Sequence, residues 1–203
     1  MAGPTVSFWQ ARFDSGQTPW DRGEASPQLA EWLRQGQVLP GERVLVPGCG
    51  RGWEVVALAR HGARVTGIDY APSALAQCRQ LLEREGVEAE LVEADVLAWS
   101  PEASADVVYE QTCLCALHPD HWVRYAAQLR AWLRPGGRLL ATLAQLPRAS
   151  AAQGVIEGPP YHLDIHAVRA LLPSAHWQWP KPPYPAVAHP IGMAELAVVL
   201  KRL

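Results

Sequence analysis

The stretch Val46-Pro47-Gly48-Cys49-Gly50-Arg51-Gly52-Trp53-Glu54 carries the strongest structural signal in this 203-residue chain. An apolar run at 44–46 leads into this glycine-rich turn, and apolar residues with helical spacing follow it at 55–59. Glycine accepts dihedrals and close approaches that a Cβ forbids, so such a turn lets a ligand contact bare backbone. The first N–H groups of the following helix lack internal partners and favour an anionic group. The stretch therefore predicts a strand, a ligand-binding turn and a helix.

The spacing of the glycines separates two kinds of nucleotide site. The dinucleotide fingerprint G-x-G-x-x-G would need glycine at positions 48, 50 and 53. Position 53 is Trp53, and the third glycine is Gly52. The resulting G-x-G-x-G pattern is typical of S-adenosylmethionine (SAM) methyltransferases with a Rossmann-like fold. An ordinary strand-to-helix turn is the alternative interpretation.

Two acidic residues follow the next two predicted strands. The strand at 64–69 ends in Asp69, about as far from the glycine turn as the acid that binds ribose hydroxyls in nucleotide-binding α/β folds. The strand at 89–93 is followed by Asp95 and Val96, which could bind the amino group and ring of adenine. Each acid alone could be a cap or a solvated loop residue. Together, at successive strand ends, they predict a nucleoside site.

The composition fits a globular domain rather than a nucleic-acid or membrane protein. The length predicts one domain over 1–203, and the net charge of −2 offers no attraction for nucleic acid. No apolar run approaches the ~20 residues of a membrane helix, and the first residues do not resemble a signal peptide. The four cysteines have no metal-binding spacing, so we expect reduced thiols, no metal site and a cytoplasmic protein.

Strands and helices alternate along the chain. We expect strands near 43–47, 64–69, 89–93, 105–110, 137–143, 175–179 and 195–201. We expect helices near 5–14, 26–35, 52–61, 72–85, 119–132 and 164–172. This alternation predicts a mostly parallel sheet with helices on both faces, and ligands bind such sheets beyond the carboxyl ends of the strands.

Three segments interrupt the alternation. Residues 7–26 and 145–162 are long connections that contain aromatic residues, and long connections in compact domains are commonly functional lids or disordered. Their aromatic residues favour lids. The third segment, 179–190, is rich in proline and is expected to form a rigid surface strap.

At this point the chain resembles the thiopurine methyltransferase-like superfamily, in its thiol/halide methyltransferase branch. The resemblance covers nearly the whole chain in order. It rests on Phe8-Trp9-Gln10-Ala11-Arg12-Phe13, Thr18-Pro19-Trp20-Asp21-Arg22-Gly23, the glycine turn, Gly67-Ile68-Asp69, Ala94-Asp95-Val96, Tyr109-Glu110-Gln111-Thr112-Cys113-Leu114-Cys115-Ala116-Leu117 and Gly158-Pro159-Pro160-Tyr161.

The resemblance implies a Rossmann-like seven-stranded sheet whose last strand is antiparallel, with an N-terminal helical lid over 1–36 that folds over bound SAM. It also implies a set of cofactor-binding residues: Trp9 and Trp20 over the cofactor, Gly48 and Gly50 at its methionine part, Asp69 at the ribose, and Asp95 and Val96 at the adenine. Gln111 and Thr112 would shape the methyl-donor end, and Glu110 is also expected to bind the cofactor.

Two positions depart from the family pattern, in which the glycine loop is often followed by His-Asp and strand four often ends in Asp. This chain has Trp53-Glu54 and Glu110 there. Both departures lie near the expected site, so they bear on the identity of the substrate.

The expected reaction is an SN2 transfer of a methyl group from SAM to a small thiol or related sulfur nucleophile. A free thiol is only a few per cent thiolate at neutral pH, so a base or cation near the acceptor would help. Tyr161 and Arg12 are the preferred catalytic candidates, although each could be structural. Other candidates are His118, His162 and Asp164, while Cys113 and Cys115 are interpreted as packing residues.

Other acceptors and one other class of protein remain open. Halide, thiocyanate or a metalloid could replace the thiol, and a SAM-binding sensor would bind without turnover. The expected partner is a small-molecule acceptor, with no nucleic acid and no membrane, and the expected assembly is a monomer or weak homodimer.

Overall fold

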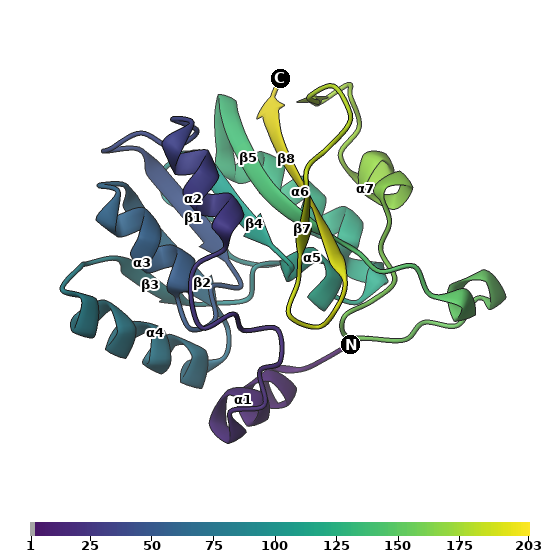
Figure 1. Ribbon diagram of the computed structural model, residues 1–203, viewed down its shortest axis with the longest axis horizontal. Helices are drawn as coiled ribbons and strands as arrows, with labels where there is room; N and C mark the ends of the chain where they lie inside the picture. The colour runs from purple at the N-terminus through teal and green to yellow at the C-terminus, as the bar shows by residue number, and fades with distance from the viewer. Residues whose placement is uncertain (1–2) are drawn as a thin grey trace.

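The computed structural model describes residues 3–203, so the first two residues of the lid expected over 1–36 lie outside the described part. One mixed sheet dominates the fold, and its strand order is β3-β2-β1-β4-β5-β8-β6, with β7 paired to β8 (Figure 1). The strands are β1 (Arg43–Pro47), β2 (Arg64–Asp69), β3 (Glu90–Glu93), β4 (Ala105–Gln111), β5 (Leu133–Gln145), β6 (Trp177–Gln178), β7 (Ala186–Ala188) and β8 (Ala194–Arg202).

The direction of the strands confirms the Rossmann-like expectation. Strands β1 to β5 pair in parallel, and β8 lies antiparallel to β5. Seven strands, the expected number, form one continuous path, and β7 is an eighth that pairs with β8.

Helices cover both faces of this sheet, because successive residues of each strand point to opposite sides. Val44 and Val46 of β1 pack with α2, α3 and α4, whereas Leu45 packs with α5, α6 and α7. The helices are α1 (Val6–Ser15), α2 (Pro27–Arg34), α3 (Trp53–Arg60), α4 (Pro72–Glu85), α5 (Cys113–Ala116), η1 (Pro119–His121), α6 (Trp122–Trp132), η2 (Ala149–Gln153) and α7 (Ile165–Leu171). None of the helices within residues 3–203 is long and apolar enough to cross a membrane.

The segment expected to be a surface strap contributes a strand. β7 pairs with the start of β8 in register Ala186↔Leu196 and Ala188↔Ala194, while β6 pairs with its end. The two short strands therefore share one edge of β8, separated by prolines that cannot donate to a ladder. The three residues of β7 are all apolar and show no alternation of apolar and polar residues that would predict a strand. β7 is a strand because it pairs with β8.

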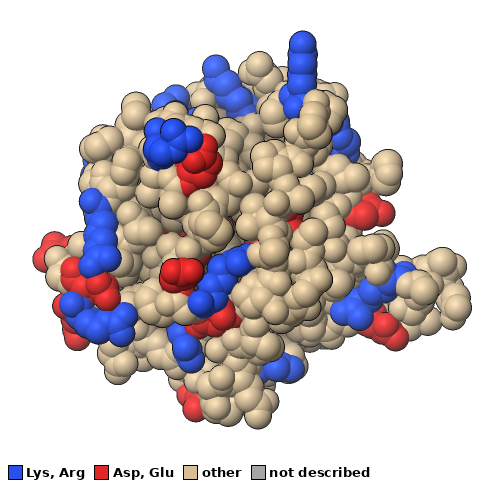
Figure 2. Space-filling model, in the orientation of Figure 1, with Lys and Arg blue, Asp and Glu red and all other residues tan. Residues whose placement is uncertain are grey.

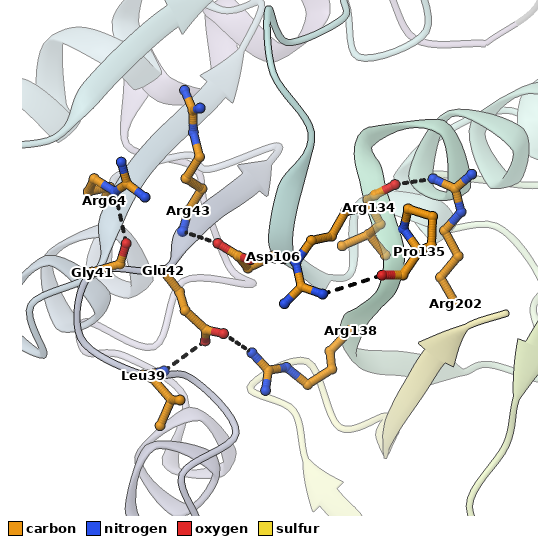
Figure 3. A network of polar contacts seen from close by, with 11 residues as sticks. Leu39, Gly41, Glu42, Arg43, Arg64, Asp106, Arg134, Pro135, Arg138 and Arg202 are labelled. Carbon is orange, nitrogen blue, oxygen red and sulfur yellow. Dashed lines mark hydrogen bonds and ion pairs between the residues drawn. The ribbon is translucent and has the colours of Figure 1, made fainter.

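Ion pairs join the amino ends of the strands, at the edge opposite the glycine turn (Figure 3). Asp106 accepts from the Arg43 N–H at 2.9 Å and from the Arg134 guanidinium at 2.7 Å. Glu42 pairs with Arg138 of β5 in the same network. On the face shown in Figure 2, basic and acidic side chains are interspersed.

Candidate active site

A cavity of about 230 Å³ lies beyond the carboxyl ends of the parallel strands. Its wall combines the N-terminal segment, the glycine turn, the ends of β2 and β4, and the turn between β7 and β8. The lining residues are Trp9, Arg12, Phe13, Pro19, Trp20, Gly48, Gly50, Asp69, Tyr70, Ala94, Asp95, Val96, Gln111, Thr112, Cys113, Cys115, Ala116, Leu117, Pro159, Pro160, His189, Ile191 and Met193.

The glycine turn is held by a buried carboxylate. Asp69 is 8% exposed, and its two oxygens accept from the N–H groups of Gly50 and Ala71, each at 3.0 Å. Burial raises the pKa of Asp69, and the backbone donors oppose that rise. Asp69 therefore lines the cavity and also fixes the turn beside it.

The backbone of the glycine turn lies close to neighbouring groups, and a side chain in place of a glycine would collide with them. A Cβ on Gly48, whose φ is +61°, would lie 3.1 Å from the Sγ of Cys113. Asp95 and Val96 line another part of the wall, and the Asp95 carboxylate accepts from the Leu97 N–H at 2.8 Å. Bare backbone, two carboxylates and two tryptophans fit a nucleoside that carries an amino acid and a sulfonium. The sulfonium is a cation, and the face of an aromatic ring attracts cations.

The N-terminal segment lies over the cavity as a layer of aromatic rings. Trp9 and Trp20 pack edge to face with centroids 5.5 Å apart, and Phe13 packs on Trp20 at 6.2 Å. The backbone oxygen of Phe13 accepts from the Gln77 amide of α4 at 3.1 Å. Arg12 lines the cavity with its guanidinium 4.5 Å from the centroid of the Phe8 ring.

The first departure from the family pattern, Trp53-Glu54, anchors this segment. The Trp53 indole donates to Asp21 at 2.9 Å, and Glu54 accepts from the Ser26 N–H at 3.0 Å. Arg51 adds an ion pair to Asp21 at 3.2 Å. These residues hold the lid rather than line the cavity.

The second departure, Glu110, lies behind the cavity and not in its wall. Its carboxylate accepts from the Leu114 N–H at 2.8 Å at the start of α5, and burial raises its pKa to about 7. The neighbouring Gln111 faces the cavity, and its amide oxygen accepts from the Tyr109 hydroxyl at 2.6 Å. Adjacent strand residues point to opposite faces, so only one of Glu110 and Gln111 can reach the cavity.

The structure also differs from the expectation for Tyr161. Its side chain is 5% exposed and packs against the His118 ring, with centroids 5.3 Å apart, while its N–H donates to the Cys115 oxygen at 2.7 Å. Pro159 and Pro160 line the cavity in its place. Of the other candidates, His162 and Asp164 also lie outside the wall; His162 accepts from the Arg148 N–H at 2.8 Å, and Asp164 caps α7.

The turn between β7 and β8 forms a part of the wall that no sequence motif indicated. His189, Ile191 and Met193 line the cavity from there. Pro190 and Gly192 mark a turn in the sequence, but nothing local shows that this turn reaches back over the glycine loop.

The fold and the composition of the cavity together define a Rossmann-like SAM-dependent methyltransferase. The model of the thiopurine S-methyltransferase family matches residues 5–181, and the chain belongs to this family. SAM is the methyl donor, and the enzyme is an S-methyltransferase.

Relatives and solved structures agree with this assignment. Probable thiol methyltransferase 2 of Arabidopsis thaliana is 29% identical over 81% of this chain and 70% of its own length. A thiopurine S-methyltransferase of Pseudomonas entomophila is 34% identical over 81% of both chains. The fold is similar to that of the Burkholderia thailandensis 1,6-didemethyltoxoflavin-N1-methyltransferase, which was crystallised with S-adenosylhomocysteine. The TM-score is 0.75 and the sequence identity 23%, over 97% of this chain and 86% of that one.

Proposed function

We propose that this enzyme methylates a small thiol that reaches the cavity as its thiolate. The observation that carries the proposal is the placement of the acids. Asp69 and Asp95 are the carboxylates among the lining residues, and both follow strands on the β2–β3 side. The opposite side, toward β5 and β8, has no unengaged base in the described residues. Such a site suits an acceptor that ionises by itself better than an alcohol or an amine.

In this proposal the methyl donor and the acceptor bind in different parts of the same cavity. Asp69 would bind the ribose hydroxyls, Asp95 and Val96 the adenine, and the backbone of Gly48 and Gly50 the methionine part. Gln111, with its amide oxygen engaged, presents an NH₂ group toward the methyl-donor end. Trp9 and Trp20 would cover the donor from above.

SAM supplies a methyl group on a sulfonium, which is already a good leaving group. The chain's own residues therefore have to hold the two sulfur atoms in line, which can supply several kcal/mol. The acceptor thiol loses its proton to solvent, a new sulfur–carbon bond forms, and the old one breaks. Anion and cation neutralise each other in this step, so the apolar, aromatic wall that excludes water favours it.

Three side chains near the proposed acceptor take supporting roles. Arg12 would attract an anionic acceptor, and the support for this role is that Arg12 lines the cavity and its guanidinium lies over the Phe8 ring. Cys113 and Cys115 would act as packing residues, since burial raises the pKa of both thiols and keeps them protonated. Neither cysteine is needed as a nucleophile.

Halide and thiocyanate form the second candidate class of acceptor. Both are already anions, so neither needs a base to remove a proton. The side of the cavity toward β5 and β8, which has no unengaged base among the described residues, would admit them. A relative named thiocyanate methyltransferase 1, from Arabidopsis thaliana, is 31% identical to this chain.

The test is a screen with methyl-labelled SAM against sulfide, ethanethiol, thiophenol, iodide, thiocyanate and one alcohol and one amine acceptor. We expect transfer to the thiols to exceed transfer to the alcohol and the amine. Calorimetry should show binding of S-adenosylhomocysteine and none of NAD. Transfer to oxygen or nitrogen alone would contradict the proposal, and binding without any turnover would favour the sensor alternative.

A further inference from the structure

The turn between β7 and β8 forms one side of the cavity. His189, Ile191 and Met193 line it, and all three lie beyond residues 5–181 that the family model matches. β8 lies next to β5, whereas Asp69 and Asp95 follow β2 and β3 on the other side of the glycine turn. This turn therefore faces the cavity from the side opposite the predicted nucleoside.

The hydrogen bonds of the turn settle the tautomer of His189. Its main-chain N–H donates to the Met193 oxygen at 2.9 Å, and its ring Nδ1 accepts from the Ile191 N–H at 3.3 Å. An Nδ1 that accepts carries no proton, so the proton of the neutral ring lies on Nε2.

The Nε2–H group of His189 has no hydrogen-bond partner among residues 3–203, and this residue, 5% exposed overall, lines the cavity. Nε2 is not one of the fully buried unpartnered polar atoms of the described residues, so this donor is accessible to a ligand or water. Burial first, and then the nearby Arg22 cation, lower the pKa of His189 to about 4. The ring is therefore neutral at physiological pH and a poor base.

The turn is held against the lid segment, so the position of His189 is well defined. The Arg22 guanidinium donates to the Ala188 oxygen at 2.6 Å and pairs with Glu195 at 2.9 Å. The Glu195 side chain is fully buried and also accepts from the Thr142 hydroxyl at 3.3 Å. One cation thus joins the N-terminal segment to both ends of the β7–β8 turn.

We propose that His189 donates its Nε2–H to the sulfur of the acceptor and orients it, and that Ile191 beside it limits the acceptor's size. This inference rests on the proposed thiol methylation and assigns its acceptor to small, soft anions such as hydrosulfide and short alkanethiolates. A neutral donor orients the thiolate without placing a full positive charge in contact with the sulfur. A cation in such contact would stabilise the ground state more than the charge-neutralising transition state.

Two substitutions at His189 separate the proposed donor from the structure of the turn. His189→Gln places an N–H donor near the position of Nε2 but loses the contact to the Ile191 N–H. His189→Asn keeps an oxygen for the Ile191 N–H but does not reach the cavity. The assay is initial-rate kinetics with sodium sulfide and with ethanethiol at saturating SAM, together with calorimetry of S-adenosylhomocysteine.

We expect His189→Asn to raise the KM for both thiols about tenfold, because a hydrogen bond to a charged sulfur is lost. His189→Gln should stay close to wild type, and both variants should keep the wild-type affinity for S-adenosylhomocysteine. The reverse order, with Asn like wild type and Gln impaired, would overturn the proposal and assign His189 to the turn. Unchanged thiol KM in both variants would overturn it as well.

A third variant tests the size limit independently. Ile191 is 39% exposed at the surface, so Ile191→Ala should fold and should enlarge this side of the cavity. We expect the kcat/KM ratio of thiophenol to hydrosulfide to rise about tenfold, and an unchanged ratio would contradict the role of Ile191. If wild type methylates no thiol, the proposed function fails together with this inference; if it does and the variants behave like wild type, only this inference fails.

Discussion

At the scale of single residues, Gly52 is the most demanding position of the glycine turn. Its φ is +87°, and a Cβ there would lie 2.2 Å from the Cys78 Sγ. We expect Gly52→Ala to lower the free energy of unfolding by roughly 2–4 kcal/mol, from left-handed strain and overpacking together. Urea denaturation measures this change.

Gly86 is the matched control for Gly52. It also has a positive φ, of +65°, but nothing lies within 4 Å of its Cβ position. Gly86→Ala should therefore cost only the conformational part, about 1 kcal/mol. Equal losses in the two variants would show that the contact with Cys78 relaxes freely.

Asp69 should matter for both the turn and the cofactor. We expect Asp69→Ala to weaken binding of SAM and S-adenosylhomocysteine by about 1–3 kcal/mol, because ribose hydroxyls and the Gly50 N–H lose a charged acceptor. Calorimetry on the folded variant measures this loss. Glu93→Ala is the control, since Glu93 is exposed and pairs with Asp69 in the sheet register. Wild-type affinity in Asp69→Ala would make Asp69 a structural residue only.

At the scale of elements, the N-terminal segment that we propose as a lid has a defined anchor. Trp9 and Trp20 are partly exposed and would gain a contact surface when the cavity is filled. We therefore expect hydrogen exchange in residues 7–23 to slow on addition of S-adenosylhomocysteine, whereas exchange in α6 should not change. Identical protection with and without the ligand would contradict the lid.

The indole of Trp53 should hold this lid in the free enzyme. Trp53→Phe removes the hydrogen bond to Asp21 and keeps most of the apolar contact. We expect faster exchange in residues 7–23 without ligand, and partial recovery with it. Wild-type exchange in this variant would mean that α1 is held by its contacts with α4 alone.

At the scale of the whole molecule, buried carboxyls make stability depend on pH. Burial raises the pKa of Glu110 to about 7, so the folded state holds this proton more tightly than the unfolded chain does. Its contribution is complete below the unfolded pKa of about 4.5 and is lost as pH rises through 7. His189, with its pKa lowered to about 4, acts in the opposite direction between roughly pH 4 and 6.5.

Glu110→Gln isolates the contribution of Glu110. Between pH 5.5 and 8 we expect wild type to lose roughly 1–3 kcal/mol more free energy of unfolding than this variant loses. Urea titrations at both pH values measure the difference, and Glu93→Gln, at an exposed position, should follow wild type. A variant with the wild-type pH dependence would show that Glu110 titrates normally in the fold.

The methyltransferase family and the part of the cavity formed by the glycine turn and the ends of β2 and β3 followed from the sequence because their signals are local. A strand, a glycine turn and a helix are determined by neighbouring residues, and an acid at a strand end is carried to the carboxyl edge by the strand itself. Gly48, Gly50, Asp69, Asp95 and Val96 therefore line one cavity as expected.

Only the tertiary structure decided the side of the cavity toward β5 and β8. Whether Glu110 or Gln111 faces the cavity depends on which face of the sheet each residue of β4 points to. Tyr161 packs against His118, so Pro159 and Pro160 line the cavity in its place. The His189 turn reaches the cavity because β8 pairs antiparallel with β5 and carries β7 with it. These contacts join residues far apart in the chain, so no local pattern could predict them.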